Sequence, residues 1–338
     1  MSTTELPQLT RKDFSSDQEV RWCPGCGDYA VLATVQSTLA DIGARPESTV
    51  FVSGIGCSSR FPYYMNTYGM HTIHGRAPAV ATGLSVSRPD LDVWVVTGDG
   101  DALSIGGNHL LHALRRNVNL TILLFNNEIY GLTKGQYSPT SPLGSVHKST
   151  PMGSIDRPLN PVSLALGAEA TFVARSIDSD RKHLSEVLAA AHAHRGASFV
   201  EIYQNCVVFN DDAFAAVTGK DTKQQNQIRL RQGEPVVFGP EGERAVVAGE
   251  DGSMRIVPTA EAGDRVVVHD ATREDPTTAF ALARLAPSPT GPTPIGIFRA
   301  VEGPVYDDLA REQVARAKAA APADLRALLE GGNIWNVG

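Results

Sequence analysis

The chain has 338 residues, of which 42% are hydrophobic and 20% are charged, and it carries a formal net charge of −7 at pH 7. A chain of this length and composition can bury a substantial core, either as one large domain or as one domain with an appendage. The acidic balance argues against a general nucleic-acid-binding surface, and the sequence lacks an apolar run as long as a membrane helix. We therefore expect neither nucleic acid nor a membrane as a partner.

The amino-terminal residues 1–13 are polar and are expected to be flexible. Because the first residues have neither the basic start nor the apolar stretch of a signal peptide, we expect a cytoplasmic protein. In that compartment, the four cysteines of the chain are more often thiolate ligands than disulfide partners.

The first chemical motif is the sequence Cys23-Pro-Gly-Cys26, which precedes an apolar run over residues 29–40 that predicts a helix. A CxxC pair places two sulfurs close together. By itself it is compatible with a redox dithiol, half of a zinc site or half of an iron–sulfur site.

The two remaining cysteines each follow a predicted buried strand. Cys57 lies in a glycine-rich loop after residues 49–53, and Cys206 comes soon after residues 198–203. Zinc sites more often use two close pairs, whereas one pair and two distant single cysteines suit a [4Fe–4S] cluster better. Four unrelated buried cysteines are the third alternative.

The segment 61–78 combines aromatic and cationic residues. Residues 61–70 are rich in aromatic side chains, which would pack beneath a loop or line a cofactor or partner contact. His74 and Arg76 precede a predicted helix over residues 79–87, and the start of a helix favours anions. A lone histidine at such a place is more often structural, and Arg76 could instead form an interfacial ion pair.

The centre of the sequence predicts a β-α-β unit with polar residues at both strand ends. Residues 92–97 read as a buried parallel strand, 103–116 as a helix and 119–125 as a second buried strand. Gly98-Asp-Gly-Asp101 follows the first strand, and Asn126-Asn127 follows the second. Open α/β sheets bind ligands at these carboxyl ends.

The residue types at the two strand ends suit a magnesium ion and a diphosphate. Asp99 offers an anionic oxygen and Asn127 a neutral one, and Mg²⁺ takes few protein ligands together with phosphate oxygens. The glycines allow the backbone to approach a phosphate. A GDG alone is more often a simple glycine turn with a capping Asp, but the pair of motifs is far more specific.

The segment after the Asn pair is rich in Ser, Pro, Gly and Thr over residues 137–161, and is expected to be a long functional loop. Residues 161–167 predict a helix, 170–174 a strand and 183–194 an amphipathic helix. His192 and His194, near the end of that last helix, are expected to be solvated.

The character of the sequence changes after residue 214, so residues 215–338 are expected to form a small β-rich and helical appendage. Its predicted elements are four short β-like runs, a helix, a Pro/Thr loop and two terminal helices: 235–238, 245–248, 255–257, 265–269, 277–285, 287–294, 307–318 and 322–330.

The spacing of GDG and NN resembles the thiamine diphosphate motif. Residues 98–109 and 125–136 resemble, more narrowly, the β subunits of the 2-oxoacid:ferredoxin oxidoreductases, most of all the two-subunit 2-oxoglutarate type. The resemblance covers residues 14–214. It implies an α/β fold, a doubly wound and mostly parallel sheet of the diphosphate-domain type, in which residues 14–214 bind both thiamine diphosphate and an iron–sulfur cluster.

The resemblance also implies the cofactors and their ligands, namely thiamine diphosphate, Mg²⁺ and a [4Fe–4S] cluster. The implied cluster ligands are Cys23, Cys26, Cys57 and Cys206. The implied magnesium ligands are Asp99, Asn127 and Ile129. The implied contacts of thiamine diphosphate lie on three loops: Gly54, Ile55, Gly56, Cys57, Ser58, His74, Gly75, Gly98, Asp99, Gly100, Asp101, Asn127 and Ile129.

Two cations near the predicted site are candidate substrate contacts. Arg60 follows the Cys57 loop and Lys134 follows the Asn pair, and both could orient a carboxylate. Solvated surface charges are the usual alternative. If both face one pocket, a dicarboxylate such as 2-oxoglutarate is favoured over pyruvate.

The implied activity is the oxidative decarboxylation of 2-oxoglutarate to succinyl-CoA and CO₂, with electrons passing through the cluster to ferredoxin. The carboxylate that activates the cofactor is expected from an α subunit, so this chain should be inactive alone and work in an α2β2 heterotetramer. The appendage would cover the cluster or the partner interface. The alternatives are pyruvate or another 2-oxoacid as substrate, a cluster-free thiamine diphosphate decarboxylase, and a zinc-stabilised α/β binding protein.

Overall fold

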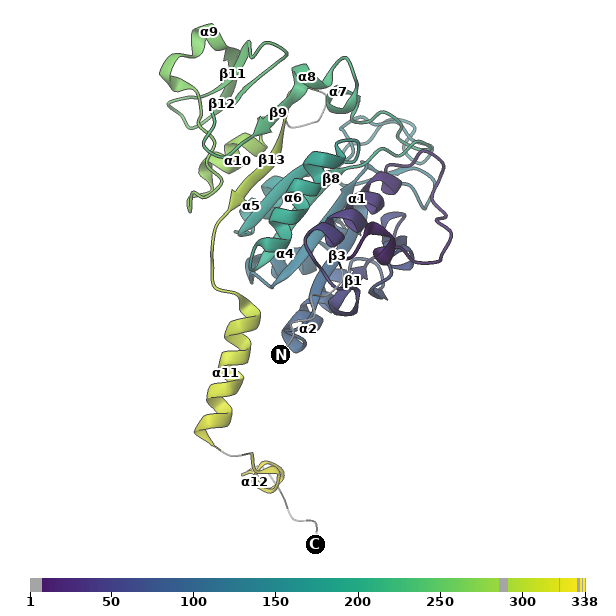
Figure 1. Cartoon of the computed structure of the whole chain (residues 1–338), viewed down its shortest axis with the longest axis vertical. Coiled ribbons are helices and arrows are strands. Elements are labelled where there is room, and N and C mark those ends of the chain that lie inside the picture. The colour runs from purple at the N-terminus through teal and green to yellow at the C-terminus, as the bar shows by residue number, and fades with distance from the viewer. Residues whose placement is uncertain (1–7, 286–290, 322, 333–334, 336, 338) are drawn as a thin grey trace.

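An eight-stranded sheet organises the chain (Figure 1), with the strand order β2-β1-β3-β4-β8-β7-β13-β9. The computed structural model describes residues 8–285, 291–321, 323–332, 335 and 337. The strands of the sheet are β1 (Thr49–Ser53), β2 (Tyr68–His71), β3 (Asp92–Gly98), β4 (Leu120–Asn126), β7 (Phe172–Ile177), β8 (Ala197–Tyr203), β9 (Gln227–Leu230) and β13 (Thr293–Ala300).

The first six strands of this order run parallel to one another, β13 runs antiparallel to β7, and β9 pairs in parallel with β13. Helices cover both faces. One face carries α1 (Asp28–Asp41) and α6 (Arg181–Ala193); the other carries α2 (Ala77–Ser87), α4 (Gly107–Arg115), α5 (Pro161–Gly167) and α10 (Thr277–Ala283). The predicted doubly wound, mostly parallel α/β fold is confirmed.

The strands form because their residues are apolar and β-branched on both sides. Every residue of β1, β4, β7 and β8 is buried, as expected for a parallel sheet that is covered by helices on both faces. Two large hydrophobic clusters result, one on each face. Trp94 and Phe125 belong to the first face, and Val95 and Leu124 to the second. The alternation fixes the register of the strands, and therefore the position of their carboxyl ends.

Two elements differ from the sequence-based expectation. The helix expected over 103–116 is divided into α3 (Asp99–Leu103) and α4, because the chain turns where the backbone N–H of Gly106 donates to the carbonyl of Asp101 at 3.1 Å. A Cβ atom on Gly106 would lie 2.5 Å from that carbonyl oxygen. The strand β2 begins within the aromatic stretch 61–70, where no strand was expected. All of its residues are exposed at the sheet edge, so the sequence has no buried apolar run that would predict it.

The histidines at the end of α6 are not solvated as expected. Nε2 of His192 lies 3.0 Å from Oδ2 of Asp92, and the imidazole stacks on Trp94. Nε2 of His194 lies 2.8 Å from the hydroxyl of Thr171. Both side chains therefore tie α6 to strands beneath it, which an amphipathic pattern does not reveal.

The amino-terminal stretch is also attached. A 3-10 helix, η1 (Arg11–Phe14), begins with a capping box between Thr10 and Asp13, and Phe14 is fully buried. The expected flexibility of residues 1–7 falls outside the described residues.

The chain beyond residue 214 is partly built into the main sheet, through β9 and β13. The outlying unit seen in Figure 1 is a three-stranded antiparallel sheet with one short helix, β10 (Val237–Phe238), β11 (Arg244–Ala248), β12 (Met254–Pro258) and α9 (Thr259–Ala262). The run expected at 265–269 follows a 3-10 helix, η4 (Gly263–Arg265), and makes isolated bridges instead of a strand. Of the expected loop at 287–294, residues 287–290 lie outside the described part, and β13 begins at Thr293.

The last two helices of the described residues are α11 (Tyr306–Ala320) and α12 (Leu325–Leu329), and α11 lies against the end of α2, where Arg311 donates to the carbonyls of Ser85 and Val86 at 3.4 Å. The first turn of α11 is anchored, because the buried carboxylate of Asp307 accepts the backbone N–H of Asn119 at 2.7 Å. Within the described residues, no helix is long and apolar enough to cross a membrane.

Candidate active site

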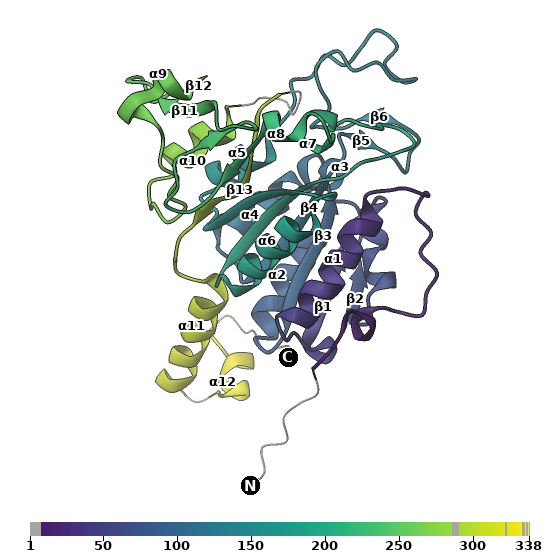
Figure 2. The ribbon, with the colours of Figure 1, turned by 45° about the horizontal axis from the view of Figure 1, so that its top comes forward.

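The loops that follow β1 and β3 leave the sheet side by side, because these strands are parallel neighbours, with Ser53 paired to Val96. The chain proceeds from β1 outward to β2 and then returns to β3, so the strand order reverses at this place. Such a switch point is where open α/β sheets bind ligands. Figure 2 shows α3, the hairpin of β5 (Ile129–Tyr130) and β6 (Gln136–Tyr137), and α7 (Ala215–Thr218) gathered at this end of the sheet.

Asp99 begins α3 and is buried at this end of the sheet. Its Oδ2 atom accepts hydrogen bonds from the hydroxyls of Ser138, at 2.5 Å, and Thr140, at 2.7 Å. Burial raises the pKa of Asp99 to about 6, although both hydroxyls act to lower it. A buried carboxylate of this kind favours a cation as its neighbour.

Glycine is required beside Asp99 for a packing reason. A Cβ atom on Gly100 would lie 2.2 Å from the ring of Tyr130, and the hydroxyl of Tyr130 donates to the carbonyl of Gly100 at 3.0 Å. The short hairpin β5–β6 is thereby held against α3. The two motifs predicted to share a site, GDG and NN, are in contact through this tyrosine.

The two asparagines of the NN motif have different surroundings. Asn126 is buried, and its Nδ2 group donates to Glu201 at 2.8 Å, while its Oδ1 atom lies 2.9 Å from the hydroxyl of Thr140. Asn127 is partly exposed; its Oδ1 atom accepts the backbone N–H of Ile129 at 3.2 Å. The oxygens of Asp99 and Asn127 therefore lie at adjoining strand ends, as a shared cation requires.

Glu128 adjoins these residues and is also buried. Burial raises its pKa to about 8, and the negative charges of Asp99 and Glu201 act in the same direction. Its backbone has a positive φ of 56°. A cation bound here would favour the charged forms of Asp99 and Glu128, whose pKa values burial raises.

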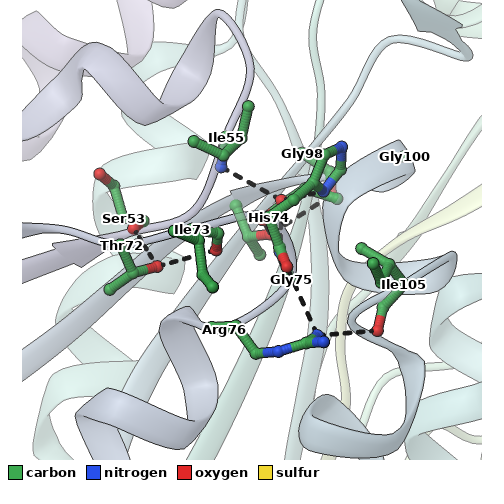
Figure 3. Close-up of polar contacts among 12 residues, drawn as sticks. Ser53, Ile55, Thr72, Ile73, His74, Gly75, Arg76, Gly98, Gly100 and Ile105 are labelled. Carbon is green, nitrogen blue, oxygen red and sulfur yellow. Dashed lines mark hydrogen bonds and ion pairs between the residues drawn. The ribbon is translucent and has the colours of Figure 1, made fainter.

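Asp101 connects three loops around the site. Its Oδ1 atom accepts the backbone N–H groups of Ile55, at 3.1 Å, and Gly75, at 2.8 Å, and lies 2.7 Å from Nδ1 of His74. Figure 3 shows Ile55, His74 and Gly75 converging beside Gly98 and Gly100. The second oxygen, Oδ2, accepts a hydrogen bond from the hydroxyl of Thr97. Since both oxygens of Asp101 have protein partners, this carboxylate holds the surrounding loops in position.

The Cys57 loop is packed tightly onto this carboxylate, since a Cβ atom on Gly54 would lie 1.8 Å from Oδ2 of Asp101. Gly56 has a positive φ of 128°. Ser58 is buried. Arg76 donates to the carbonyls of His74, at 3.4 Å, and Ile105, at 3.2 Å (Figure 3), and an ion pair with a partner chain stays a prediction.

The four cysteines are free thiols, of which Cys23 is exposed and the other three are partly exposed. A Cβ atom on Gly131 would lie 3.6 Å from the sulfur of Cys57 and 3.9 Å from that of Cys206. Burial raises the pKa of Cys57 to about 11, and Asp28, Cys206 and Cys23 act in the same direction. Burial likewise raises the pKa of Cys26, with Cys206 and Cys57 among the contributing charges.

The thiols are thus among the groups that raise one another's pKa, but their sulfurs do not converge on a single metal position. Within the described ranges, no group of three or more His, Cys, Asp or Glu side chains is arranged to hold a single metal ion. A four-iron cube spreads its thiolates over its corners, so thiols around a shared space are the arrangement it needs. Thiols are the ligands that such a cluster takes, and two of them lie beside Gly131 while a third accepts a hydrogen bond from Gln204.

Arg60 and Lys134 are both exposed. The guanidinium of Arg60 lies 5.9 Å from the ring centroid of Tyr63, and its Nε atom donates to the hydroxyl of Tyr64 at 3.0 Å. Lys134 lies in the turn between β5 and β6, with a φ of 75°. Their contact with a substrate stays a prediction.

Three residues of the site were missed by the motif: Ser138, Thr140 and Gln204. The first two lie in the long loop 137–161, and its richness in Ser and Thr was the available signal. Gln204 accepts from Nδ2 of Asn127 at 2.8 Å and donates to the sulfur of Cys26 at 3.3 Å. The sequence shows that Gln204 follows a predicted strand, but it does not show which side chains Gln204 contacts.

Comparisons with known proteins agree with this geometry. Residues 54–202 match the family described as thiamine pyrophosphate enzyme, C-terminal TPP binding domain. The 2-oxoglutarate oxidoreductase subunit KorB of Mycobacterium tuberculosis is 61% identical over 339 residues, which cover 99% of this chain and 90% of that protein. Subunit beta of 2-oxoacid:ferredoxin oxidoreductase 1 of Aeropyrum pernix is 47% identical over 190 residues, covering 56% of this chain and 60% of that protein.

A solved structure is similar over nearly the whole chain. It is the 2-oxoglutarate:ferredoxin oxidoreductase from Magnetococcus marinus, with 2-oxoglutarate, coenzyme A and succinyl-CoA bound. The TM-score is 0.77 at 34% sequence identity, and the match covers 96% of this chain and 97% of that chain.

Proposed function

The chain belongs to the β subunits of the 2-oxoacid:ferredoxin oxidoreductases, and from this premise we propose that it acts with an α subunit to decarboxylate 2-oxoglutarate oxidatively. One 2-oxoglutarate and one coenzyme A would give succinyl-CoA, CO₂, a proton and two electrons, which pass to two ferredoxin molecules. The observation that carries the proposal is the position of Asp99 and Asn127 after the neighbouring parallel strands β3 and β4, with Gln204 hydrogen-bonded to both Asn127 and the sulfur of Cys26.

The diphosphate half of the site would hold magnesium through Asp99, Asn127 and the backbone carbonyl of Ile129, since hard oxygen ligands and phosphates suit Mg²⁺. Thiamine diphosphate, when bound, supplies the electron sink for decarboxylation. The backbone of the three loops would contact it, at Gly54, Ile55, Gly56, Cys57, Ser58, Gly75, Gly98 and Gly100. His74 would lie beside the diphosphate, held by Asp101.

The cysteine half of the site would hold a [4Fe–4S] cluster through Cys23, Cys26, Cys57 and Cys206. Two of these sulfurs, those of Cys57 and Cys206, face Gly131, where a Cβ atom would lie within 4 Å of both, and this common position supports the assignment. Four reduced thiols require a reducing compartment, which supports the cytoplasm as the location.

The 2-oxoacid would be oriented by Arg60 and Lys134. The activating carboxylate, and most of the site for the substrate and coenzyme A, would come from the α subunit in an α2β2 assembly. Residues 14–214 would form the cofactor-binding unit. The later residues would cover the cluster or meet the α subunit.

The test is anaerobic analysis of iron, sulfide and zinc, with a visible spectrum, on the chain co-expressed with its α partner. We expect about four iron and four sulfide per β chain, and bleaching of the spectrum by 2-oxoglutarate with coenzyme A. Bleaching by pyruvate but not by 2-oxoglutarate would contradict the proposed substrate. Zinc without iron would contradict the proposed cluster.

A Cys57→Ser variant refines the same test, because it should lose the cluster while keeping the binding of thiamine diphosphate. A normal iron content in that variant would remove Cys57 from the ligand set.

A further inference from the structure

Gln204 joins the two halves of the site. It directly follows β8, which runs parallel to β4 with Asn126 paired to Tyr203. The next residues along the two strands, Asn127 and Gln204, are therefore neighbours. Oε1 of Gln204 accepts from Nδ2 of Asn127 at 2.8 Å, and Nε2 of Gln204 donates to the sulfur of Cys26 at 3.3 Å.

The neighbours of Gln204 fix the orientation of its amide. Oδ1 of Asn127 accepts the backbone N–H of Ile129, so its Nδ2 group faces Gln204 and requires an acceptor there. The second N–H of Gln204 donates to the carbonyl of Asn205 at 2.5 Å. The side chain is 1% exposed, so its hydrogen bonds are made away from water and are costly to lose.

We propose that Gln204 is a positioning residue that sets the reduction potential of the cluster and links this potential to occupancy of the diphosphate site. The inference rests on the proposed function, since it requires a cluster on Cys26 and a cation on Asn127. A donor aimed at a ligand sulfur stabilises the added negative charge of the reduced cluster. Hydrogen bonds to the sulfurs are among the features that tune iron–sulfur potentials.

The link to the diphosphate site follows from polarisation along the hydrogen-bonded chain. A divalent cation on Oδ1 of Asn127 draws charge from that amide and makes its Nδ2 group a stronger donor. Gln204 then becomes a stronger donor toward Cys26. Magnesium with thiamine diphosphate should therefore raise the potential of the cluster, and by linkage the reduced enzyme should bind them more tightly than the oxidised enzyme.

The test is an anaerobic redox titration of the αβ enzyme, followed by electron paramagnetic resonance, with and without magnesium and thiamine diphosphate. Wild type is compared with Gln204→Leu, which keeps a similar volume without a donor, and with Gln204→Glu, which keeps the acceptor for Asn127 but replaces the donor with a negative charge. We expect the potential to fall from wild type to the Leu variant and further to the Glu variant. The response to magnesium and thiamine diphosphate should vanish in the Leu variant.

The matched control is Gln36→Leu. Gln36 is also buried, at 3% exposed, and is hydrogen-bonded at both ends, to Arg11 and to the carbonyl of Tyr64. It lies on α1, eight residues after the first residue of that helix, or about 12 Å along its axis. Its loss should lower stability and leave the potential at the wild-type value, which separates a specific effect from general damage to the fold.

Iron-containing Gln204 variants with the wild-type potential would overturn this inference and leave the proposed function intact. A wild-type enzyme without iron would overturn the proposed function itself. If the Leu variant loses its cluster, the Glu variant decides, because it keeps the shape and the acceptor: a lowered potential supports the inference and an unchanged potential refutes it.

Discussion

At the scale of single residues, the site depends on side chains that hold the predicted ligands in place. Two hydroxyls from the loop 137–161 fix the orientation of the Asp99 carboxylate, because both of them donate to the same oxygen. Thr140 also lies against Asn126, so one threonine touches both motifs. A buried carboxylate with fixed partners keeps one orientation, which a metal site needs.

Replacing Asp99 by alanine should abolish the binding of thiamine diphosphate in the presence of Mg²⁺, because it removes the anionic ligand. Isothermal titration calorimetry on the cofactor-depleted αβ enzyme measures this, and the iron content should not change. Asp90→Ala is the control, since Asp90 is an exposed carboxylate paired with Arg88. An unaltered affinity in the Asp99 variant would rule it out as a ligand.

Replacing Arg60 by alanine should raise the KM for the 2-oxoacid by about tenfold, as expected for one lost hydrogen bond to a charged group, and should change the KM for coenzyme A much less. Arg60→Lys should give an intermediate value, because an ammonium lacks the bidentate fork. Steady-state kinetics of the αβ enzyme measure both constants. An unchanged KM for the 2-oxoacid would make Arg60 a surface charge.

At the scale of elements, α6 shows how polar contacts decide what periodicity leaves open. The helix begins at Arg181, because the carboxylate of Asp180 accepts the backbone N–H of His183 at 3.2 Å. Nδ1 of His183 lies 2.8 Å from the hydroxyl of Ser176 on β7. At the other end of the helix, His192 contacts Asp92 on β3. Two histidines thus attach one helix to two strands.

The two histidines should affect stability in opposite directions as the pH changes. Burial, with Arg229 nearby, lowers the pKa of His183 to about 4 in the folded protein, so its contribution is complete above about pH 6.5 and is lost as the pH falls toward 4. The hydrogen bond to Asp92 raises the pKa of His192, so its contribution is present below about pH 6.5 and is lost as the pH rises through the folded value.

His183→Gln should therefore flatten the loss of stability on acidification, by up to roughly 1.4 kcal/mol per pH unit below 6.5, whereas His192→Gln should steepen it. The unfolding midpoint between pH 7.5 and pH 5.5 measures both slopes. Equal slopes in wild type and both variants would contradict these assignments.

At the scale of the whole molecule, a buried ion pair connects the site with the carboxyl-terminal part of the sheet. Nε of Arg175 on β7 lies 2.6 Å from Oε2 of Glu201 on β8, and the two side chains are 2% and 0% exposed. Arg175 also donates to the carbonyl of Pro294 on β13 at 3.2 Å, and Glu201 accepts from Asn126. The antiparallel strand β13 is therefore joined to the residues behind the diphosphate site.

Arg175→Met should destabilise the protein by about 3–5 kcal/mol, because Glu201 would remain buried without its partner. The double variant Arg175→Met with Glu201→Gln should recover part of this loss, since the amide is neutral and still accepts from Asn126. Chemical denaturation measures both values. Arg88→Met, in an exposed pair, should have a much smaller effect, because water and salt screen that pair; an equally small effect for Arg175→Met would contradict the burial argument.

The sequence by itself determined the class of fold and the position of the two motifs. Short apolar runs that are rich in β-branched residues and are bounded by turn residues favour strands of a sheet covered on both faces, and local composition is enough to indicate this. A GDG and an NN after two such runs must then meet at one edge, because parallel strands end on the same side. The resemblance of these motifs identified the family that the comparisons support.

Tertiary structure alone decided which side chains surround those motifs. Ser138 reaches Asp99 across a long loop, and Gln204 meets Asn127 only because β8 pairs with β4 in one particular register. The strands β9 and β13 complete the main sheet from a part of the chain that reads as an appendage. These contacts join residues far apart in the sequence, so they depend on strand order and register, which short-range patterns do not encode.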